Sequence, residues 1–383
     1  MSKNRIILWC FALFSAFLSA ACSNGDGDFR NNDRRADGDG EARTGSQLQV
    51  TKRKQVALSM AYLAYSGEQI IVRWPWDKTI PREILNIINT TMPKIRVLKN
   101  DWKVVWGPAI YKFELALLQD NMMFVAQNRK DPSQYIVAVR GTNGMAFLDW
   151  YEEDFRVVEK VPWEVPQGVR VKGKPHISKA TQIGLNALLT ELRPNDQVPG
   201  DQRIEPFLKE LARKKVDICF VGHSLAGALA PTLALWFHQS QGLVHGWDPS
   251  NNATISTIAF AGPTAGDADF RDFFNEQLGG RCTRIHNTND IATKAWQTSR
   301  VKTMFGLYRS VGIEMTRLEH DLVKWIIKHV KDYEQIQTPE GFTFPLTRSP
   351  TYDTYLKQAS YQHSHSYPIQ LRVPELNNVI RKR

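Results

Sequence analysis

Residues 221–228, which read Val-Gly-His-Ser-Leu-Ala-Gly-Ala, constrain the fold of this chain more than any other stretch. The run before them, residues 216–221, is short, apolar and β-branched, which predicts a buried strand. The apolar run after them, residues 225–239, is long enough for a helix. Ser224 is therefore predicted at a sharp strand-to-helix turn, where its hydroxyl stands clear of a sheet edge.

The predicted turn alone does not show that Ser224 has a catalytic role. Gly222 supplies a small residue two places before Ser224, but Ala226 stands two places after it and Gly227 follows one position late. With glycine at about 7% of residues, a Gly-x-Ser-x-(Gly or Ala) string arises by chance in roughly one chain in four of this length. A Gly/Ser turn without a catalytic role explains the string by itself, so the rest of the chain must decide.

The amino terminus is predicted to direct export. Residues 1–21 combine early basic residues with an apolar run that is too short to span a bilayer, which is typical of a signal peptide. The run ends on Leu-Ser-Ala-Ala-Cys, which resembles the lipobox of a bacterial lipoprotein with Cys22 as the lipidated residue. Ordinary cleavage after Ala21, giving a secreted protein, is the alternative. Residues 22–47 are rich in Gly, Asp, Asn and Arg and predict a flexible tether.

The composition of the chain limits the kind of fold that the remaining residues, 48–383, can form. The chain is 42% hydrophobic and 23% charged, which suits a single large globular domain. Its net charge of +10 is spread along the chain without a nucleic-acid-binding motif, so we expect a solvated basic surface, with attraction to anionic lipid as the alternative. Cys219 and Cys282 lie in apolar strand-like runs, and we interpret them as buried hydrophobic residues rather than a disulfide.

Alternating elements in the body of the chain predict an α/β fold with a mainly parallel sheet. Strands are predicted over residues 122–126, 135–139, 216–221, 254–260 and 281–286, and helices over 55–65, 81–98, 176–192, 204–214, 225–239, 268–278 and 317–333. Turn residues between the first two strands predict an antiparallel hairpin. Residues 144–151 are apolar yet follow a Gly-Thr-Asn-Gly stretch. They are interpreted as a lid over an apolar cleft or as a short buried helix.

A serine nucleophile needs a histidine base and a carboxylate that orients it, in the order Ser, Asp or Glu, His for this type of fold. The acidic candidates after Ser224 are Asp248, Asp267, Asp269, Asp272 and Asp290. Asp267 and Asp269 open a predicted helix, where capping explains them. Asp290 follows the strand 281–286 and therefore falls at the carboxyl edge of the sheet, where the turn at Ser224 also opens.

Four histidines come late enough to act as the base: His320, His329, His363 and His365. His320 and His329 lie in the predicted helix 317–333, off or beside its apolar stripe, and are interpreted as surface residues. His363 and His365 lie in a polar segment after a predicted helix, where a loop could return one of them to the sheet edge. The residues alone do not decide whether His363 or His365 is the base.

Several motifs, taken in order, resemble the class 3 lipases, the family of fungal triacylglycerol lipases and their bacterial relatives. The motifs are Ala-Val-Arg-Gly-Thr at 138–142, Asp-Trp at 149–150 with Asp154, Gly-His-Ser-Leu-Ala-Gly-Ala-Leu-Ala at 222–230, Phe-Ala-Gly-Pro at 260–263 and Asn-Asp-Ile at 289–291. The resemblance spans Val56 to about Leu371 and implies an α/β-hydrolase fold.

The resemblance also implies roles for individual residues. Ser224 corresponds to the nucleophile, Asp290 to the acid, and Thr142 and Leu225 to the two oxyanion-hole donors. His363 is favoured over His365 as the base, because the family's histidine is followed a few residues later by an aromatic residue and Tyr367 fits that spacing. The resemblance also favours a lid over residues 144–151 rather than a short buried helix.

The predicted function is hydrolysis of lipid carboxylic esters through an acyl-enzyme, similar to a triacylglycerol lipase, with no metal or organic cofactor. Phospholipase A1-type activity on membrane lipids is the alternative within enzymes, and a non-catalytic envelope lipoprotein that keeps the fold is the alternative outside them. The segment after Asp290, Ala-Thr-Lys-Ala-Trp at 292–296, lacks a proline common in the family, and Ala226 departs from the usual glycine. Ala226 is expected to tighten the turn, and the divergent segment 292–296 means that the substrate cannot simply be transferred from relatives.

Overall fold

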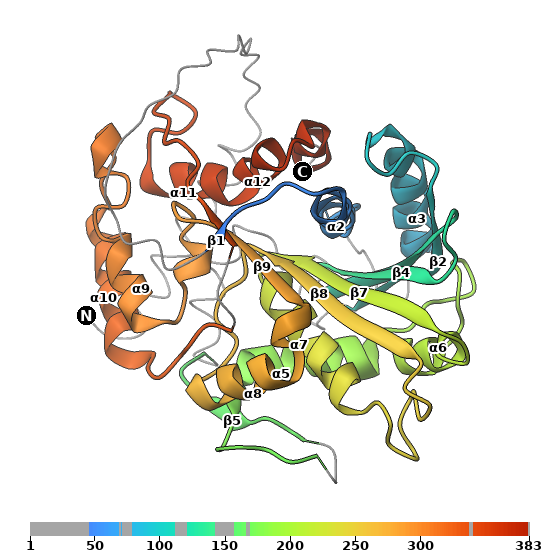
Figure 1. Cartoon of the computed structure of the whole chain (residues 1–383). Coiled ribbons are helices and arrows are strands. Elements are labelled where there is room, and N and C mark those ends of the chain that lie inside the picture. Colours follow the sequence, from blue (N-terminus) through green and yellow to red (C-terminus); the bar gives the residue numbers. More distant parts are fainter. Residues whose placement is uncertain are drawn as a thin grey trace. The chain divides into compact units, whose positions relative to one another are not determined.

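In the computed structural model, the described part of the chain forms one sheet of eight strands in the order β1-β10-β9-β8-β7-β4-β3-β2 (Figure 1). The structure describes residues 46–68, 70, 79–111, 121–141, 157–165, 169–336 and 340–381. The chain divides into two units, 1–44 and 45–383, and the described residues all belong to the second. The predicted export signal, most of the tether and the predicted lid lie outside the described residues.

The sheet is parallel over most of its width, which confirms the predicted fold class. β7 (Val216–His223) pairs in parallel with β4 (Gln134–Val139) on one side and with β8 (Ala253–Phe260) on the other. Beyond β8 the parallel order continues through β9 (Cys282–Asn287), β10 (Glu340–Phe342) and β1 (Ser46–Gln47). β3 (Asn121–Asn128) is antiparallel to β4 and to β2 (Trp102–Tyr111), so the predicted hairpin is confirmed. A separate two-stranded sheet joins β5 (Lys160–Pro162) to β6 (His176–Ser178).

Helices cover both faces of the sheet (Figure 1). One face carries α5 (Lys179–Asn186), α6 (Ile204–Leu211), α7 (Ala226–Gln239) and α8 (Ala268–Leu278). The other carries α2 (Lys52–Leu63), α3 (Thr79–Thr91), α11 (Tyr355–Ser364) and α12 (Ser366–Gln370). The remaining helices are α9 (Thr298–Val301), α10 (Arg317–His329) and α13 (Asn377–Arg381), with short turns at Met92–Lys94, Ala187–Glu191, Gly279–Arg281, Ala292–Lys294, Lys302–Met304, Arg309–Val311 and Pro374–Leu376.

Burial on the two faces forms two cores that share the sheet. The core under α7 contains Phe220 and Phe270, and the core under α2 contains Phe124 and Phe260, all with side chains out of contact with solvent. Removing this much apolar surface from water is the main favourable contribution to folding. The arrangement fixes β7, β8 and β9 as the buried centre on which any site at their carboxyl ends depends.

Five of these helices begin at a polar residue whose side chain accepts a hydrogen bond from a backbone N–H in the first turn. They are Thr51 for α2, Ser178 for α5, Asp267 for α8, Thr316 for α10 and Thr354 for α11. Each cap satisfies one amide that the helix itself leaves unpaired. The cap at Ser178 also explains one difference from prediction: the expected helix over 176–192 starts only at residue 179, because residues 176–178 pair as a strand instead.

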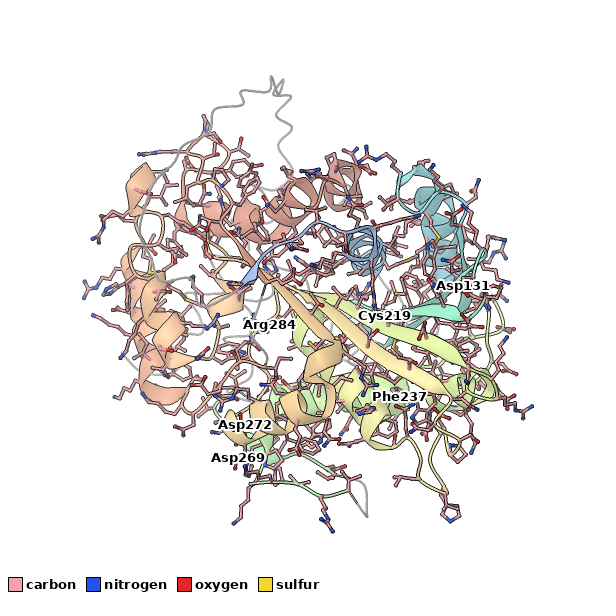
Figure 2. The ribbon with its side chains drawn as sticks, viewed as in Figure 1. Asp131, Cys219, Phe237, Asp269, Asp272 and Arg284 are labelled. Carbon is pink, nitrogen blue, oxygen red and sulfur yellow. The ribbon has the colours of Figure 1, made fainter. Side chains whose placement is uncertain are left out.

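The two described cysteines are free thiols that pack in different cores, so the disulfide alternative is wrong. Cys219 lies on β7, and Cys282 lies on β9, the strand that also carries Arg284 (Figure 2). Burial raises the pKa of the Cys219 thiol and raises that of Cys282 to about 12. Both therefore behave as small apolar residues. Within the described residues, no helix is both long and apolar enough to cross a membrane.

Candidate active site

Ser224 occupies a sharp turn between β7 and α7, as predicted from the sequence. Its backbone φ is +62°, a left-handed conformation that is unfavourable for a residue with a Cβ. The Ser224 amide donates to the carbonyl of Phe260 on β8 at 3.0 Å, which anchors the turn to the neighbouring strand. Strained backbone of this kind persists only where surrounding contacts hold it, and it is common at functional sites.

The small residues around the turn have separate steric roles. A Cβ at Gly222 would lie 2.1 Å from the Ala226 carbonyl oxygen, so the strand and the helix can cross only if Gly222 is glycine. A Cβ at Gly227 would lie 2.6 Å from the Cα of Gly262, in the loop after β8. Gly227 is therefore not a displaced copy of the usual motif glycine. It allows α7 to approach the end of β8, while the methyl group of Ala226 is accommodated because Gly222 has none.

Asp290 lies beyond the end of β9 and its side chain is completely buried. Its carboxylate accepts three hydrogen bonds: from Nδ1 of His363 at 2.9 Å, from the Tyr367 hydroxyl at 2.8 Å and from the Ala292 amide at 2.9 Å. Burial, reinforced by the nearby Asp290, raises the pKa of the Tyr367 hydroxyl well above its usual range, which keeps it a donor. A buried carboxylate with three donors is held in one orientation.

His363 lies in the last turn of α11, so the expectation that a loop carries it is wrong. The helix itself brings the imidazole to the sheet edge, because its carboxyl end packs against β7 and β9. A carboxylate can only accept, so Nδ1 of His363 carries the proton that it donates to Asp290. Nε2 of His363 is buried and forms no hydrogen bond with any of the described residues. The imidazole is thus oriented through Nδ1.

The carboxyl end of α11 is fixed by side chains that bind its last carbonyl groups. A helix leaves these carbonyls without partners inside the helix. We call the three side chains the carbonyl clamp; it consists of Tyr62, which donates to Ser364 O at 2.7 Å, His223, whose Nε2 donates to His363 O at 3.0 Å, and Asn287, which donates to Gln362 O at 3.1 Å. The clamp joins the helix that carries His363 to α2, to the residue next to Ser224 and to the end of β9.

The aromatic surroundings of His223 strengthen this connection. The His223 ring lies 4.6 Å from the His363 ring and 5.0 Å from the Tyr62 ring, measured between centroids. The Tyr65 hydroxyl lies 3.2 Å from Nδ1 of His223 and donates to the His223 carbonyl at 3.0 Å. His223 is therefore held on both ring nitrogens between the serine turn and the histidine helix.

Burial and nearby positive charges lower the pKa values of two basic side chains on β9. Burial, together with Arg300, lowers the pKa of Arg284 to about 9. Burial, then Arg284 and Arg300, lowers the pKa of His286 to about 3. His286 is therefore neutral near pH 7 and adds no positive charge close to the strand end that leads to Asp290.

The other predicted site residues lie in different surroundings. His365 follows α11 and stacks on Tyr361 with ring centroids 5.6 Å apart, whereas the histidine that binds Asp290 in the described part of the chain is His363. Leu225 caps the start of α7, and its amide forms no hydrogen bond within the described part of the chain. Thr142 and the predicted lid over residues 144–151 lie outside the described residues.

The rejected candidates have structural roles. Asp248 organises the turn before β8 through the amides of Asn252 and Ala253, and Asp267 caps α8 as expected. His320 packs on Phe305 and His329 stacks on Trp325, both on α10 or its neighbouring turn. Among the described residues, no group of three or more His, Cys, Asp or Glu side chains could hold a metal ion.

Sequence reasoning missed the carbonyl clamp. Tyr62 falls in a segment predicted only as a packing helix, and Asn287 falls in a loop considered only for its neighbour Asp290. His223 stands inside the serine motif, which is the one available signal that it has a role. None of these positions shows in sequence which carbonyl it binds, because the contacts join residues 75 to 302 positions apart.

Comparison with known proteins agrees with this geometry. The pattern of the family described as Lipase (class 3) matches residues 136–299. The crystal structure of M37 lipase is similar with a TM-score of 0.77 and 33% sequence identity, covering 86% of this chain and 97% of that one. Phospholipase A1-II 4 of Oryza sativa subsp. japonica is 33% identical over 168 residues, which is 42% of this chain and 39% of the rice protein.

The match to the rice protein covers less than half of that protein's length, whereas the similarity to M37 lipase extends over nearly all of it. The family pattern begins on β4 and ends on α9, so it contains the Ser224 turn and Asp290. We conclude that the chain belongs to the class 3 lipase family and is a carboxylic ester hydrolase.

Proposed function

We propose that the protein hydrolyses carboxylic esters of lipids through a triad of Ser224, His363 and Asp290. The observation that carries the proposal is the buried imidazole of His363, which donates to Asp290 at 2.9 Å through Nδ1 while Nε2 has no hydrogen-bond partner among the described residues. A base poised in this way can take a proton from a serine hydroxyl. Membership of the lipase family supports a lipid ester as the substrate.

The proposed reaction has two steps. Ser224 Oγ attacks the ester carbonyl carbon while Nε2 of His363 accepts the hydroxyl proton, and that proton then leaves with the alcohol as the acyl-enzyme forms. In the second step a water molecule attacks the acyl carbonyl carbon while the same nitrogen accepts its proton. The bond between the acyl carbon and Ser224 Oγ then breaks, Oγ takes the proton, and the carboxylic acid leaves. Asp290 holds the imidazole in the required tautomer and stabilises the imidazolium.

The negative oxygen of each tetrahedral intermediate needs donors fixed in advance. The Leu225 amide, at the start of α7, is one proposed donor, and the positive end of the helix dipole supports it. Thr142 is the other proposed donor, on the strength of the family resemblance. Each such donor contributes about 3 kcal/mol to lowering the barrier.

The triad is tested by single substitutions assayed on a short-chain ester. We expect Ser224→Ala and His363→Ala to lower kcat by about 10³-fold or more, because each removes a group that takes part in the bond changes. His365→Ala is the matched control on the same helix end and should keep near-normal turnover. If His365→Ala were inactive and His363→Ala active, the base assignment would be wrong.

The similarity to the rice phospholipase A1 favours a second candidate, hydrolysis of membrane phospholipids. Release of fatty acid from phosphatidylglycerol vesicles and from an emulsified triglyceride distinguishes the two substrates. We expect the triglyceride to give the larger kcat/KM, with Ser224→Ala as the blank for both. A clear preference for the vesicles would replace the lipase proposal with the phospholipase one.

We also propose that the protein is exported and anchored to a membrane surface through a lipid on Cys22, which would place the enzyme near its substrate. Growth with radioactive palmitate should label the full-length protein, and Cys22→Ala should remove the label. An unlabelled protein whose mature chain starts directly after Ala21 would show that it is secreted without an anchor.

The carbonyl clamp gives His223 and Tyr62 a proposed positioning role, since they hold the backbone that carries the base. Losing one such hydrogen bond is worth about 1 kcal/mol, so we expect Tyr62→Phe or His223→Phe to lower kcat roughly fivefold with KM unchanged. A tilted His363 binds Asp290 less well, so the loss should fall on kcat and not on substrate binding.

Two variants serve as controls for the clamp. Tyr333→Phe removes another buried tyrosine-to-carbonyl hydrogen bond, to Val157 O at 2.7 Å, and should leave kcat and KM unchanged. His223→Gln keeps an N–H near the original position and should recover part of the lost kcat. Equal effects of Tyr62→Phe and Tyr333→Phe would mean that the clamp stabilises the fold without positioning the base.

A further inference from the structure

Arg284, labelled on β9 in Figure 2, is a buried cation. Its side chain is 1% exposed, and its Nε, Nη1 and Nη2 atoms form no hydrogen bond with any described residue. A guanidinium carries five N–H donors and keeps its charge in proteins, and a buried charge is costly unless it is paired. Arg284 therefore needs an acceptor, preferably an anionic one, that the described residues do not supply.

The described groups around Arg284 are positive or neutral. Those that act on it electrostatically are Arg300 on α9, the Cys282 thiol and the Tyr367 hydroxyl. Burial, Arg284 and Arg300 each lower the pKa of His286, which lies two residues further along the strand. Positive charge is therefore in excess at this part of β9, where little water is present to screen it.

Glu334 is the described carboxylate that acts on Arg300, and other side chains already share it. It accepts a hydrogen bond from Nε2 of Gln297 at 2.8 Å and lies 3.7 Å from Nη1 of Arg271. The Glu334 side chain is also 40% exposed, so solvent screens its charge. Glu334 therefore compensates Arg300 only in part, and it forms no hydrogen bond with Arg284.

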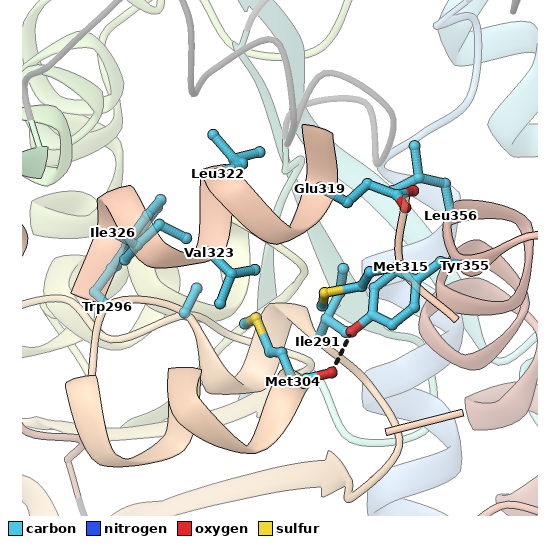
Figure 3. A pocket seen from close by; sticks show the side chains of 11 residues that line it. Ile291, Trp296, Met304, Met315, Glu319, Leu322, Val323, Ile326, Tyr355 and Leu356 are labelled. Carbon is cyan, nitrogen blue, oxygen red and sulfur yellow. Dashed lines mark hydrogen bonds between the residues drawn. The ribbon is translucent and has the colours of Figure 1, made fainter. Parts of the chain in front are cut away.

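The apolar cavity beside Ile291 and α10 supplies no acceptor for Arg284 either. Trp296, which comes shortly before α9, lines that cavity together with side chains of α10 (Figure 3). The acidic residue in the lining, Glu319, lies at the opposite end from Trp296 and accepts from the Thr316 hydroxyl at 2.9 Å. Its carboxylate is thus engaged in the cap of α10.

The side chains that share a face of the sheet with Arg284 are small, and two of them can donate hydrogen bonds. Because side chains alternate along a strand, Cys282 and Arg284 point to the same face, and their partners across β8 are Thr257 and Ala259. The Thr257 hydroxyl is buried and forms no hydrogen bond with any described residue. Burial raises the pKa of the Cys282 thiol to about 12, so the thiol keeps its proton. A guanidinium, a hydroxyl and a thiol can all donate, and such a set of donors selects an anion.

We infer that Arg284 and the Thr257 hydroxyl bind a small monovalent anion, such as chloride, on the face of the sheet that α7 and α8 cover. A site this deeply buried suits a small ion, and one guanidinium balances one negative charge. The inference goes beyond the proposed function, because the anion takes no part in ester hydrolysis. It would pair the charge on the strand that leads to Asp290 and so stabilise that part of the sheet.

The test is thermal unfolding of the full-length protein titrated with sodium chloride, with sodium gluconate added to keep the ionic strength constant. Gluconate is too large for the buried site, and a constant ionic strength leaves the screening of surface charges unchanged. A ligand that binds only the folded state raises Tm in a saturable way, and we expect a rise of about 4 °C once chloride exceeds its Kd about 100-fold. A Tm that does not respond to chloride would overturn the inference.

Three variants assign the effect to the site. Arg284→Met removes the charge and should abolish the rise in Tm, and an unchanged response in this variant would overturn the inference. If Arg284→Met fails to fold, Thr257→Val removes only the hydroxyl and should raise the Kd for chloride about tenfold. The matched control is Arg281→Met. Arg281 directly precedes β9, is exposed and donates to Nε2 of His238 at 3.0 Å, so its loss should leave the chloride response intact.

Bromide locates the anion, because its anomalous scattering identifies it in a crystal. Crystals soaked in sodium bromide should show an anomalous peak within hydrogen-bond distance of the Arg284 guanidinium. A peak there without a saturable rise in Tm would mean an adventitious ion only, and a carboxylate of the chain bound to Arg284 would also overturn the inference. Ser224→Ala, which should abolish ester hydrolysis, should keep the full chloride response, so failure of the proposed function is distinguished from failure of the anion site.

Discussion

The hydrogen bond between His363 and Asp290 joins two residues 73 positions apart, and the candidate site depends on it. A buried carboxylate is costly unless donors surround it, and Asp290 has three. Two of these donors, on His363 and Tyr367, come from the consecutive helices α11 and α12. The same contacts that satisfy the acid therefore dock the carboxyl-terminal helices on the sheet, so packing and catalytic geometry cannot be separated here.

The end of α11 shows how this docking is made specific. Helix ends leave carbonyl groups that need partners, and water cannot supply them at a buried end. The carbonyl clamp supplies them from three elements, one of which is His223, next to Ser224. The residue before Ser224 thereby binds the backbone of His363 directly. The proposed nucleophile and the proposed base are connected through the main chain.

Sequence reasoning predicted the parts of the fold that depend on local pattern. The strand before Ser224, the hairpin of β3 and β4 and the position of Asp290 after β9 all follow from periodicity and order along the chain. The location of His363 inside α11, the carbonyl clamp and the cavity beside Ile291 could not be predicted in this way. Each depends on which distant side chains meet after packing, and a single sequence carries no direct signal of those pairings.

The strained turn at Ser224 is supported by a second strained turn beside it. Ser224 and Ala261 both have positive φ values, and they follow the adjacent strands β7 and β8. The Ser224 amide binds Phe260 O, and Gly227 meets Gly262 backbone to backbone, so each turn supports the other. Backbone strain of about 1–3 kcal/mol at such a residue persists only if contacts with neighbouring residues hold that conformation in place. The paired turns provide that support, and the methyl group of Ala226 is accommodated because Gly222 has no Cβ.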